Sequence, residues 1–178
     1  VVTDFSSSDA VPPGGTVATL APRRFVFAAA AIVGFAFLLM ELVWYRMLAP
    51  LLGGTTFTFG LILAVALLGI GLGAVAYATK PNRETTMNAF AISCAAEALF
   101  IAIPFALGDR LAVFALLIRS IGGLGFFGFT IGWFMVTAIV ILPAAFVSGV
   151  QFPILIALLG RGDGSVGRDV GLAYAWNT

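Results

Sequence analysis

The sequence contains no histidine and a single cysteine, Cys94. Without histidine, these residues offer no imidazole ligand for haem or a metal and no usual general base at neutral pH. One cysteine allows neither an intrachain disulfide nor a cysteine-based zinc site. We therefore expect no catalytic, cofactor-binding or metal-binding residues, and we predict that the chain is not an enzyme.

Charge is also scarce, since 10% of the 178 residues are charged and the formal net charge is +1. A nucleic-acid partner would require a basic stripe to neutralise phosphates, so no nucleic-acid binding is expected. Apolar residues dominate instead: 61% of the residues are hydrophobic and the mean hydropathy is +1.12. A chain this short cannot bury so much apolar surface in one water-soluble core. The sequence predicts an all-α, polytopic transmembrane helical bundle whose partner is the lipid bilayer.

Long uncharged runs define the expected organisation, because about 20 apolar residues cross a bilayer as a helix. We predict a flexible polar N-terminal tail over residues 1–22 and a transmembrane helical domain over 23–178. The expected spans are 25–46, 57–78, 86–107 and 126–147.

Shorter segments complete this expected domain. The apolar residues 111–118 are too few to span, so they form either an interfacial piece or an extension of the third span. Pro143 and Pro153 favour an end to the fourth span, followed by an interfacial segment over 150–160. A further helix is expected to start at residue 170.

Lysine and arginine residues predict the orientation, because cytoplasmic loops carry an excess of them. With four spans, the predicted inside residues are Arg23, Arg24, Lys80, Arg83, Arg161 and Arg168, against Arg46, Arg110 and Arg119 outside. We expect a cytoplasmic N-terminus in a bacterial inner (cytoplasmic) membrane.

Two carboxylates, Glu41 and Glu97, fall inside expected spans, where ionisable groups are costly and are often functional. Glu97 lies about 11 residues into its span, near the midplane, whereas Glu41 lies about 16 residues in, nearer the outer face. They do not form an obvious pair. Two interpretations stay open: a proton or cation relay, or structural hydrogen bonding to Tyr45 and Ser93, each one turn away.

Arg46 is the third candidate intramembrane polar residue. It follows Trp44 and Tyr45 at a helix end, where aromatic and basic residues commonly anchor a helix at the membrane interface, and this interpretation is favoured over a ligand role. Arg46 lies five residues after Glu41, so the two side chains do not share a helix face.

Glycines offer a packing role. Gly69 and Gly73 lie with Ala66 and Ala76 on one helical stripe, and small residues in such a stripe let transmembrane helices approach closely. The spacing does not match a nucleotide-binding glycine loop, and no strand precedes it. Gly128 and Gly132 offer a second helix-packing contact in the fourth span.

The stretch ELVWYRMLAPLLGGTTFTFGLILAVALLGIGLGA, residues 41–74, resembles the first helical hairpin of the spermidine-synthase-like integral membrane proteins. In that family a Major-Facilitator-like helical region precedes, or is fused to, a soluble aminopropyltransferase-type domain. The resemblance recurs in LPAAFVSGVQFPILIALL (142–159) and VGRDVGLAYAWNT (166–178). Its motif positions are Glu41, Trp44, Arg46, Pro50, Gly53, Pro153, Tyr174 and Asn177. The family's glycine-rich nucleotide loop and acidic amine-binding residues have no counterpart here, so no synthase residues carry over.

The expected function is a non-catalytic integral membrane scaffold or accessory subunit that packs against other integral membrane subunits in a larger complex. A respiratory or photosynthetic complex would be a suitable host. The alternative is part of a small-cation or polyamine transporter, based on Glu41, Glu97 and the resemblance. A second alternative is the membrane anchor of a spermidine-synthase-like enzyme whose soluble domain is absent from these residues.

Overall fold

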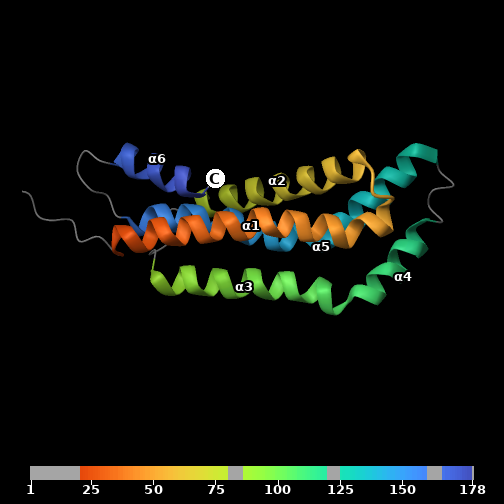
Figure 1. Ribbon diagram of the computed structural model, residues 1–178, viewed down its shortest axis with the longest axis horizontal. Coiled ribbons are helices and arrows are strands. Elements are labelled where there is room, and N and C mark those ends of the chain that lie inside the picture. The colour runs from red at the N-terminus through yellow and green to blue at the C-terminus, as the bar shows by residue number, and fades with distance from the viewer. Residues whose placement is uncertain (1–20, 80–85, 120–124, 160–165, 178) are drawn as a thin grey trace, which may run out of the picture.

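The computed structural model describes residues 21–79, 86–119, 125–159 and 166–177. All but the last two residues of the predicted N-terminal tail lie outside this range. Within it, the regular structure consists of α-helices: α1 (Arg23–Leu52), α2 (Thr56–Ala78), α3 (Met87–Ala106), α4 (Gly108–Arg119), α5 (Gly125–Leu158) and α6 (Val166–Asn177) (Figure 1). Four of these, α1, α2, α3 and α5, are long and apolar enough to cross a membrane. The predicted all-α, polytopic membrane fold is confirmed.

The first helix runs to Leu52, six residues beyond its expected end, although Pro50 lies inside it. Pro50 sits in the last turn, so its missing N–H removes only one backbone hydrogen bond close to the helix end. The helix stops at Gly53, whose φ of 97° is left-handed and whose N–H donates to the Ala49 carbonyl at 2.9 Å. Glycine adopts this conformation without steric cost, which explains why the chain turns here.

The next helix begins immediately and is capped by threonines. The Thr55 hydroxyl oxygen accepts a hydrogen bond from the Thr58 backbone N–H at 3.3 Å, which satisfies one of the unpaired donors at the start of α2. Thr58 is fully buried, and its hydroxyl donates to the Leu52 carbonyl at 3.3 Å. These bonds tie the end of α1 to the start of α2.

The central helix of the bundle is α5, which packs against α2, α3, α1 and α4. Half of its most apolar window is buried inside the protein, against 17% for α1 and for α3. In Figure 1, α1, α2, α3 and α5 run along the long axis, and α4 leads from α3 towards the start of α5. Helices α1 and α3 therefore expose most of their apolar surface to whatever surrounds the bundle.

The interfacial segment expected over residues 150–160 is not a separate piece. Residues 150–158 are about the last quarter of α5, which continues through Pro143 and Pro153. Gln151, Leu155 and Leu158 are buried there against other helices. Each proline removes one backbone hydrogen bond, but an apolar environment favours keeping the remaining ones within the helix, so the helix persists.

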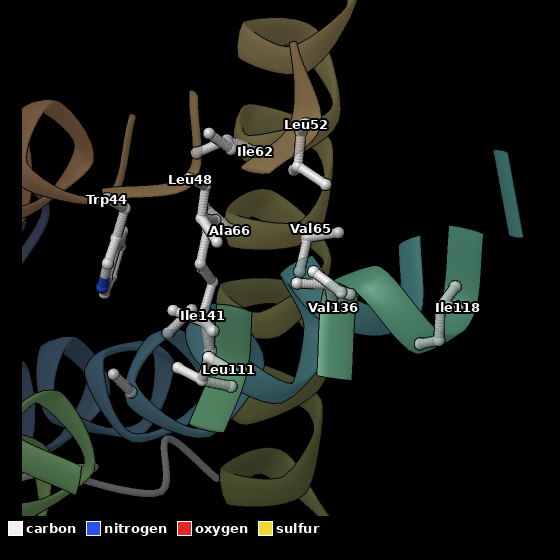
Figure 2. Close-up of a cluster of buried hydrophobic side chains, with 14 residues drawn as sticks. Trp44, Leu48, Leu52, Ile62, Val65, Ala66, Leu111, Ile118, Val136 and Ile141 are labelled. Carbon is white, nitrogen blue, oxygen red and sulfur yellow. The ribbon is translucent and has the colours of Figure 1, made fainter. Parts of the chain in front are cut away.

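Two clusters of buried apolar side chains hold the helices together. Figure 2 shows the first, in which side chains from α1, α2, α4 and α5 converge. This hairpin-side cluster comprises Trp44, Leu48, Leu52, Ile62, Val65, Ala66, Leu111, Ala115, Ile118, Val136, Val140, Ile141, Ala144 and Ala145. The second, here the terminal-side cluster, lies nearer the starts of α1 and α6 and comprises Ala21, Val26, Ala30, Phe90, Ile154, Leu155, Leu158, Leu159 and Ala173.

The short helix α4 is a helix of its own and not a simple continuation of α3, while its interfacial position stays a prediction. It begins after a turn at Leu107 and buries Leu111, Ala115 and Ile118 in the hairpin-side cluster. Its contact with α5 is close at Gly132, where a Cβ would overlap the Cγ2 atom of Ile118. These three residues of α4 therefore pack against protein, whereas Val113, Leu116 and Leu117 of the same helix are exposed.

The last helix, α6, starts four residues earlier than expected and packs along α1. Arg23 Nη2 lies 2.8 Å from Asp169 Oδ2 at one end of this contact. At the other end, Asn177 Nδ2 donates to the Ala30 carbonyl at 2.9 Å, and a Cβ on Gly34 would overlap the Asn177 backbone. Because both sets of residue numbers increase in the same direction, α6 runs parallel to α1.

Candidate functional site

A hydrogen-bonded acid–amide pair connects α3 to α5 inside the bundle. Gln151 Nε2 donates to Glu97 Oε2 at 2.8 Å. Gln151 is fully buried, with 0% of its surface exposed, and Glu97 is half-buried. The pair lies where the two clusters meet, because Cys94 and Val150 pack on the terminal-side cluster while Ile101 and Ala145 belong with the hairpin-side cluster.

Hydrogen-bond acceptors outnumber donors at this pair. Gln151 Oε1 is buried and has no hydrogen-bond partner among the residues that the structure describes. Within the described residues Glu97 forms no salt bridge, and the salt bridge between Arg23 and Asp169 does not involve it. A buried acceptor without a donor is costly, so the arrangement favours a group that can donate hydrogen bonds or carry positive charge.

A groove of about 480 Å³ is bordered by α2, α3 and α5; its lining includes the sequence neighbours of Glu97 and Gln151 but neither of these two residues. Ser93 and Ala96 line it beside Glu97, and Val147, Val150 and Ile154 line it beside Gln151. The remaining wall residues are Ala76, Tyr77, Ala89, Ile92 and Phe146. The walls are thus largely apolar, with hydroxyl groups at two positions.

The partner of Glu97 differs from the one that sequence spacing suggested. Ser93 donates its hydroxyl hydrogen to the Phe90 carbonyl at 2.7 Å, within its own helix, and the partner of Glu97 is Gln151. Sequence reasoning missed Gln151. The available signal was a lone amide side chain within the long uncharged stretch 120–160, where any polar side chain needs a partner.

Glu41 also lacks its expected partner. The Tyr45 hydroxyl donates to the Gly54 carbonyl at 3.3 Å, and no hydrogen bond or ion pair of Glu41 is recorded within the described residues. Glu41 is half-buried, and Arg46 is exposed. The structure does not pair Glu41 with Glu97: Glu41 lies on α1, and Glu97 on α3 accepts its hydrogen bond from Gln151 of α5.

The indole of Trp44 is not an interface anchor. Its side chain is 2% exposed and packs edge-on against Phe37, with ring centroids 5.8 Å apart, in the hairpin-side cluster. Trp44 lies four residues before the buried Leu48 and thus on the inward stripe of α1, which its closeness to a helix end does not reveal. Tyr45 and Arg46 follow on neighbouring faces.

The predicted packing glycines occupy two different contacts. Gly69 and Gly73 of α2 face α5: a Cβ on Gly69 would lie 2.6 Å from the Ala145 Cβ, and one on Gly73 would overlap the Phe146 carbonyl. Gly149 of α5 is equally close to Ile70 of α2. Gly128 and Gly132 are buried on α5, and Gly132 meets the short helix α4 instead of another long helix.

Comparisons with known proteins add no assignment to this geometry. The chain matches no protein-family model, no curated protein and no solved structure. Among the described residues, no group of three or more cysteine, aspartate or glutamate side chains is placed to hold a metal ion. The acid–amide pair, the groove and the half-buried Glu41 are the candidate sites.

Proposed function

We propose that this chain is a non-catalytic membrane subunit that packs laterally against another integral membrane protein. The observation that carries the proposal is Glu41. A carboxyl group within a membrane-spanning helix usually faces protein or water and binds a partner. Glu41 has the same helical phase as the inward residues Gly34 and Leu48, yet it remains half-exposed.

The surroundings of Glu41 support a helical partner. The last turn of α6 covers α1 at Gly34, and Glu41 lies seven residues, or about two turns, further along the same face. The apolar side chain of Leu38, three residues before Glu41 on nearly the same face of α1, is 50% exposed and available for packing. A neighbouring helix that brings a hydrogen-bond donor to Glu41 would satisfy the carboxyl group and cover apolar surface together.

The first test is Glu41→Leu in a tagged chain purified from its native membrane in mild detergent. We expect recovery of the associated membrane protein to fall about fivefold, since one hydrogen bond between transmembrane helices contributes roughly 1 kcal/mol. Quantitative mass spectrometry of the purified material measures this ratio.

Two variants serve as controls for that experiment. Glu41→Gln keeps a hydrogen-bonding side chain of the same size and should retain most of the partner. Ile32→Ala changes a residue that is 68% exposed on the opposite face of α1, nine residues before Glu41, and should leave recovery unchanged. A chain that migrates alone for the wild type, or equal recovery for Glu41→Leu, would contradict the proposal.

We also propose a cytoplasmic N-terminus in a bacterial inner membrane. Arg23, Arg24 and Arg168 lie at the same end of the bundle, because the Arg23–Asp169 salt bridge joins the starts of α1 and α6. Lys80, Arg83 and Arg161 are outside the described residues, as is the Arg119 side chain. This gathering of positive charge supports the orientation.

A reporter fusion tests that orientation. Green fluorescent protein joined before the first residue should fluoresce, because it folds on the cytoplasmic side, and alkaline phosphatase at the same point should be inactive. Active phosphatase with a dark fluorescent fusion would reverse the proposed orientation.

Transport of a small cation or polyamine, and anchoring of a spermidine-synthase-like domain, stay predictions.

A further inference from the structure

We propose that the groove between α2, α3 and α5 holds an acyl chain of a membrane phospholipid, drawn from the leaflet in which α2 ends and α3 begins. This site is separate from the contact proposed at Glu41, which lies on α1. The position of the groove, its dimensions and its apolar walls all fit an alkyl chain better than a helix or a polar ligand.

The groove forms because two helices share a third as their neighbour. Both α2 and α3 pack against α5, whereas contact between α2 and α3 is minimal among the described residues. On α3 the lining residues fall on one helix face, because they follow the spacing i, i+3, i+4 and i+7 from Ala89. On α5 they lie between Phe146 and Ile154, and on α2 they are the neighbours Ala76 and Tyr77. The groove thus lies between three helices that are each long and apolar enough to cross a membrane.

The groove reaches about as deep as one leaflet of the bilayer. Its outer end is marked by Tyr77 and Ala89, which lie in the last turn of α2 and the first turn of α3. Ile154 lies at the same end, because it packs with Phe90 in the terminal-side cluster, which Tyr77 also contacts. From Ile154 back to Phe146 the groove follows α5 for roughly 12 Å, at 1.5 Å per residue. One leaflet contributes about 15 Å of the hydrocarbon core, so the groove follows the path of an acyl chain from the membrane surface towards the midplane.

The same dimensions argue against a helix as the occupant. A volume of about 480 Å³ over this length gives a mean cross-section of roughly 40 Å². An α-helix with its side chains is about 10–12 Å in diameter, so its cross-section is at least about twice as large. A helix from a second copy or from another protein would therefore not enter the groove, whereas a linear alkyl chain can.

The walls of the groove are uncharged and offer little hydrogen bonding. None of the described residues that line it is charged, and the Ser93 hydroxyl is already used on the Phe90 carbonyl at 2.7 Å. Ile92 of the α3 wall is 69% exposed and Phe146 of the α5 wall is 38% exposed, so the groove opens onto the outer apolar surface of the bundle. A lipid chain can therefore enter sideways from the bilayer. An unfilled apolar gap would forgo the dispersion contacts that such a chain supplies.

The first experiment uses the unmodified protein in nanodiscs that contain a phosphatidylethanolamine with a photoactivatable diazirine midway along one acyl chain. Half of the sample is exchanged into mild detergent before irradiation, and mass spectrometry of peptides maps the labelled residues. We expect labelling of the groove residues Ala96 and Val147 to fall less than about twofold after the exchange. Labelling of Ile32 and Leu67, which are 68% and 58% exposed on the outer surface, should fall about tenfold or more, because weakly held lipid dissociates quickly.

The second experiment measures phospholipid phosphorus per chain after the same detergent exchange. The wild type should retain about one phospholipid. Ala96→Phe and Ala89→Phe each place a ring in the groove, at its inner and its outer part, and should lower the retained phospholipid about tenfold. Ala91→Phe is the matched control, because it adds the same side chain at an exposed position on the other side of α3, and it should retain as much lipid as the wild type.

Several results would overturn the proposal. Equal loss of label from the groove residues and from the outer surface would show that the groove holds lipid no more tightly than the rest of the bundle does. Unchanged retention in both Ala96→Phe and Ala89→Phe, or an equal loss in Ala91→Phe, would place the retained lipid elsewhere. The labelling experiment needs no substitution, so it decides the matter even if a variant fails to fold.

Discussion

Replacing Gly73 with alanine is expected to lower the free energy of unfolding by about 2 kcal/mol, because one added carbon overpacks a close helix crossing. The new Cβ would overlap the backbone carbonyl of Phe146 on α5, and a backbone group cannot rotate away as a side chain can. Unfolding by sodium dodecyl sulfate in mixed micelles, followed by circular dichroism, measures the change.

The same helix provides the control. Gly71 is exposed, and a Cβ added there meets nothing within 4 Å. Gly71→Ala should therefore be neutral or stabilising, by up to about 1 kcal/mol, since alanine favours the helix more than glycine does. If Gly73→Ala unfolds at the same detergent fraction as Gly71→Ala, the close approach of α2 and α5 is wrong.

The partner side of this crossing should respond in the same way. Gly149 lies against the Ile70 backbone, so Gly149→Ala should also destabilise the protein. Once Gly73→Ala has pushed the helices apart, the second substitution should add less than its separate effect, because neighbouring sites are not additive. The two substitutions thus report on one shared contact between the parallel helices α2 and α5.

Removing one member of the acid–amide pair is expected to cost about 2 kcal/mol. Glu97→Leu leaves the Gln151 amide buried without its acceptor, and Gln151→Leu leaves Glu97 without its donor. The double variant Glu97→Leu/Gln151→Leu should recover about 1 kcal/mol or more relative to the sum of the single losses, because both polar groups are gone. The same detergent-unfolding measurement on the four proteins gives the coupling energy.

A strictly additive result would contradict the contact between α3 and α5 at this point. Ser93→Ala is a suitable reference, because the Ser93 hydroxyl donates to the Phe90 carbonyl within its own helix, α3. It should change stability little and show no coupling to Gln151→Leu. The double-variant cycle therefore separates the pair across helices from a local polar group on the same helix face.

The acid–amide pair depends on α5 being one continuous helix. Gln151 lies eight residues after Pro143 and two before Pro153, in the stretch that the sequence indicated as interfacial. The structure keeps it helical and buried, with Ile154 and Leu155 packed in the terminal-side cluster. A helix broken at Pro143 would separate Gln151 from Glu97, so the continuity of α5 is a condition for the candidate site.

Hydropathy alone determined the class of the fold. Runs of apolar residues predicted four membrane-spanning helices, and α1, α2, α3 and α5 are long and apolar enough for that role. Local signals were also sufficient for the turn after α1, because Gly53 and Gly54 adopt left-handed conformations that favour glycine. The small residues at 69 and 73 share one helix face by spacing alone, before any partner helix is known.

Tertiary structure decided which polar and aromatic groups meet. Gln151 binds Glu97 across 54 positions of sequence, Trp44 enters a core instead of an interface, and Glu41 takes no part in the acid–amide pair. The physical reason is that hydropathy and periodicity describe one helix at a time, and nearly every face of these helices is apolar. Which face turns inward depends on close approaches such as Gly73 against Phe146, and only the packed bundle contains them.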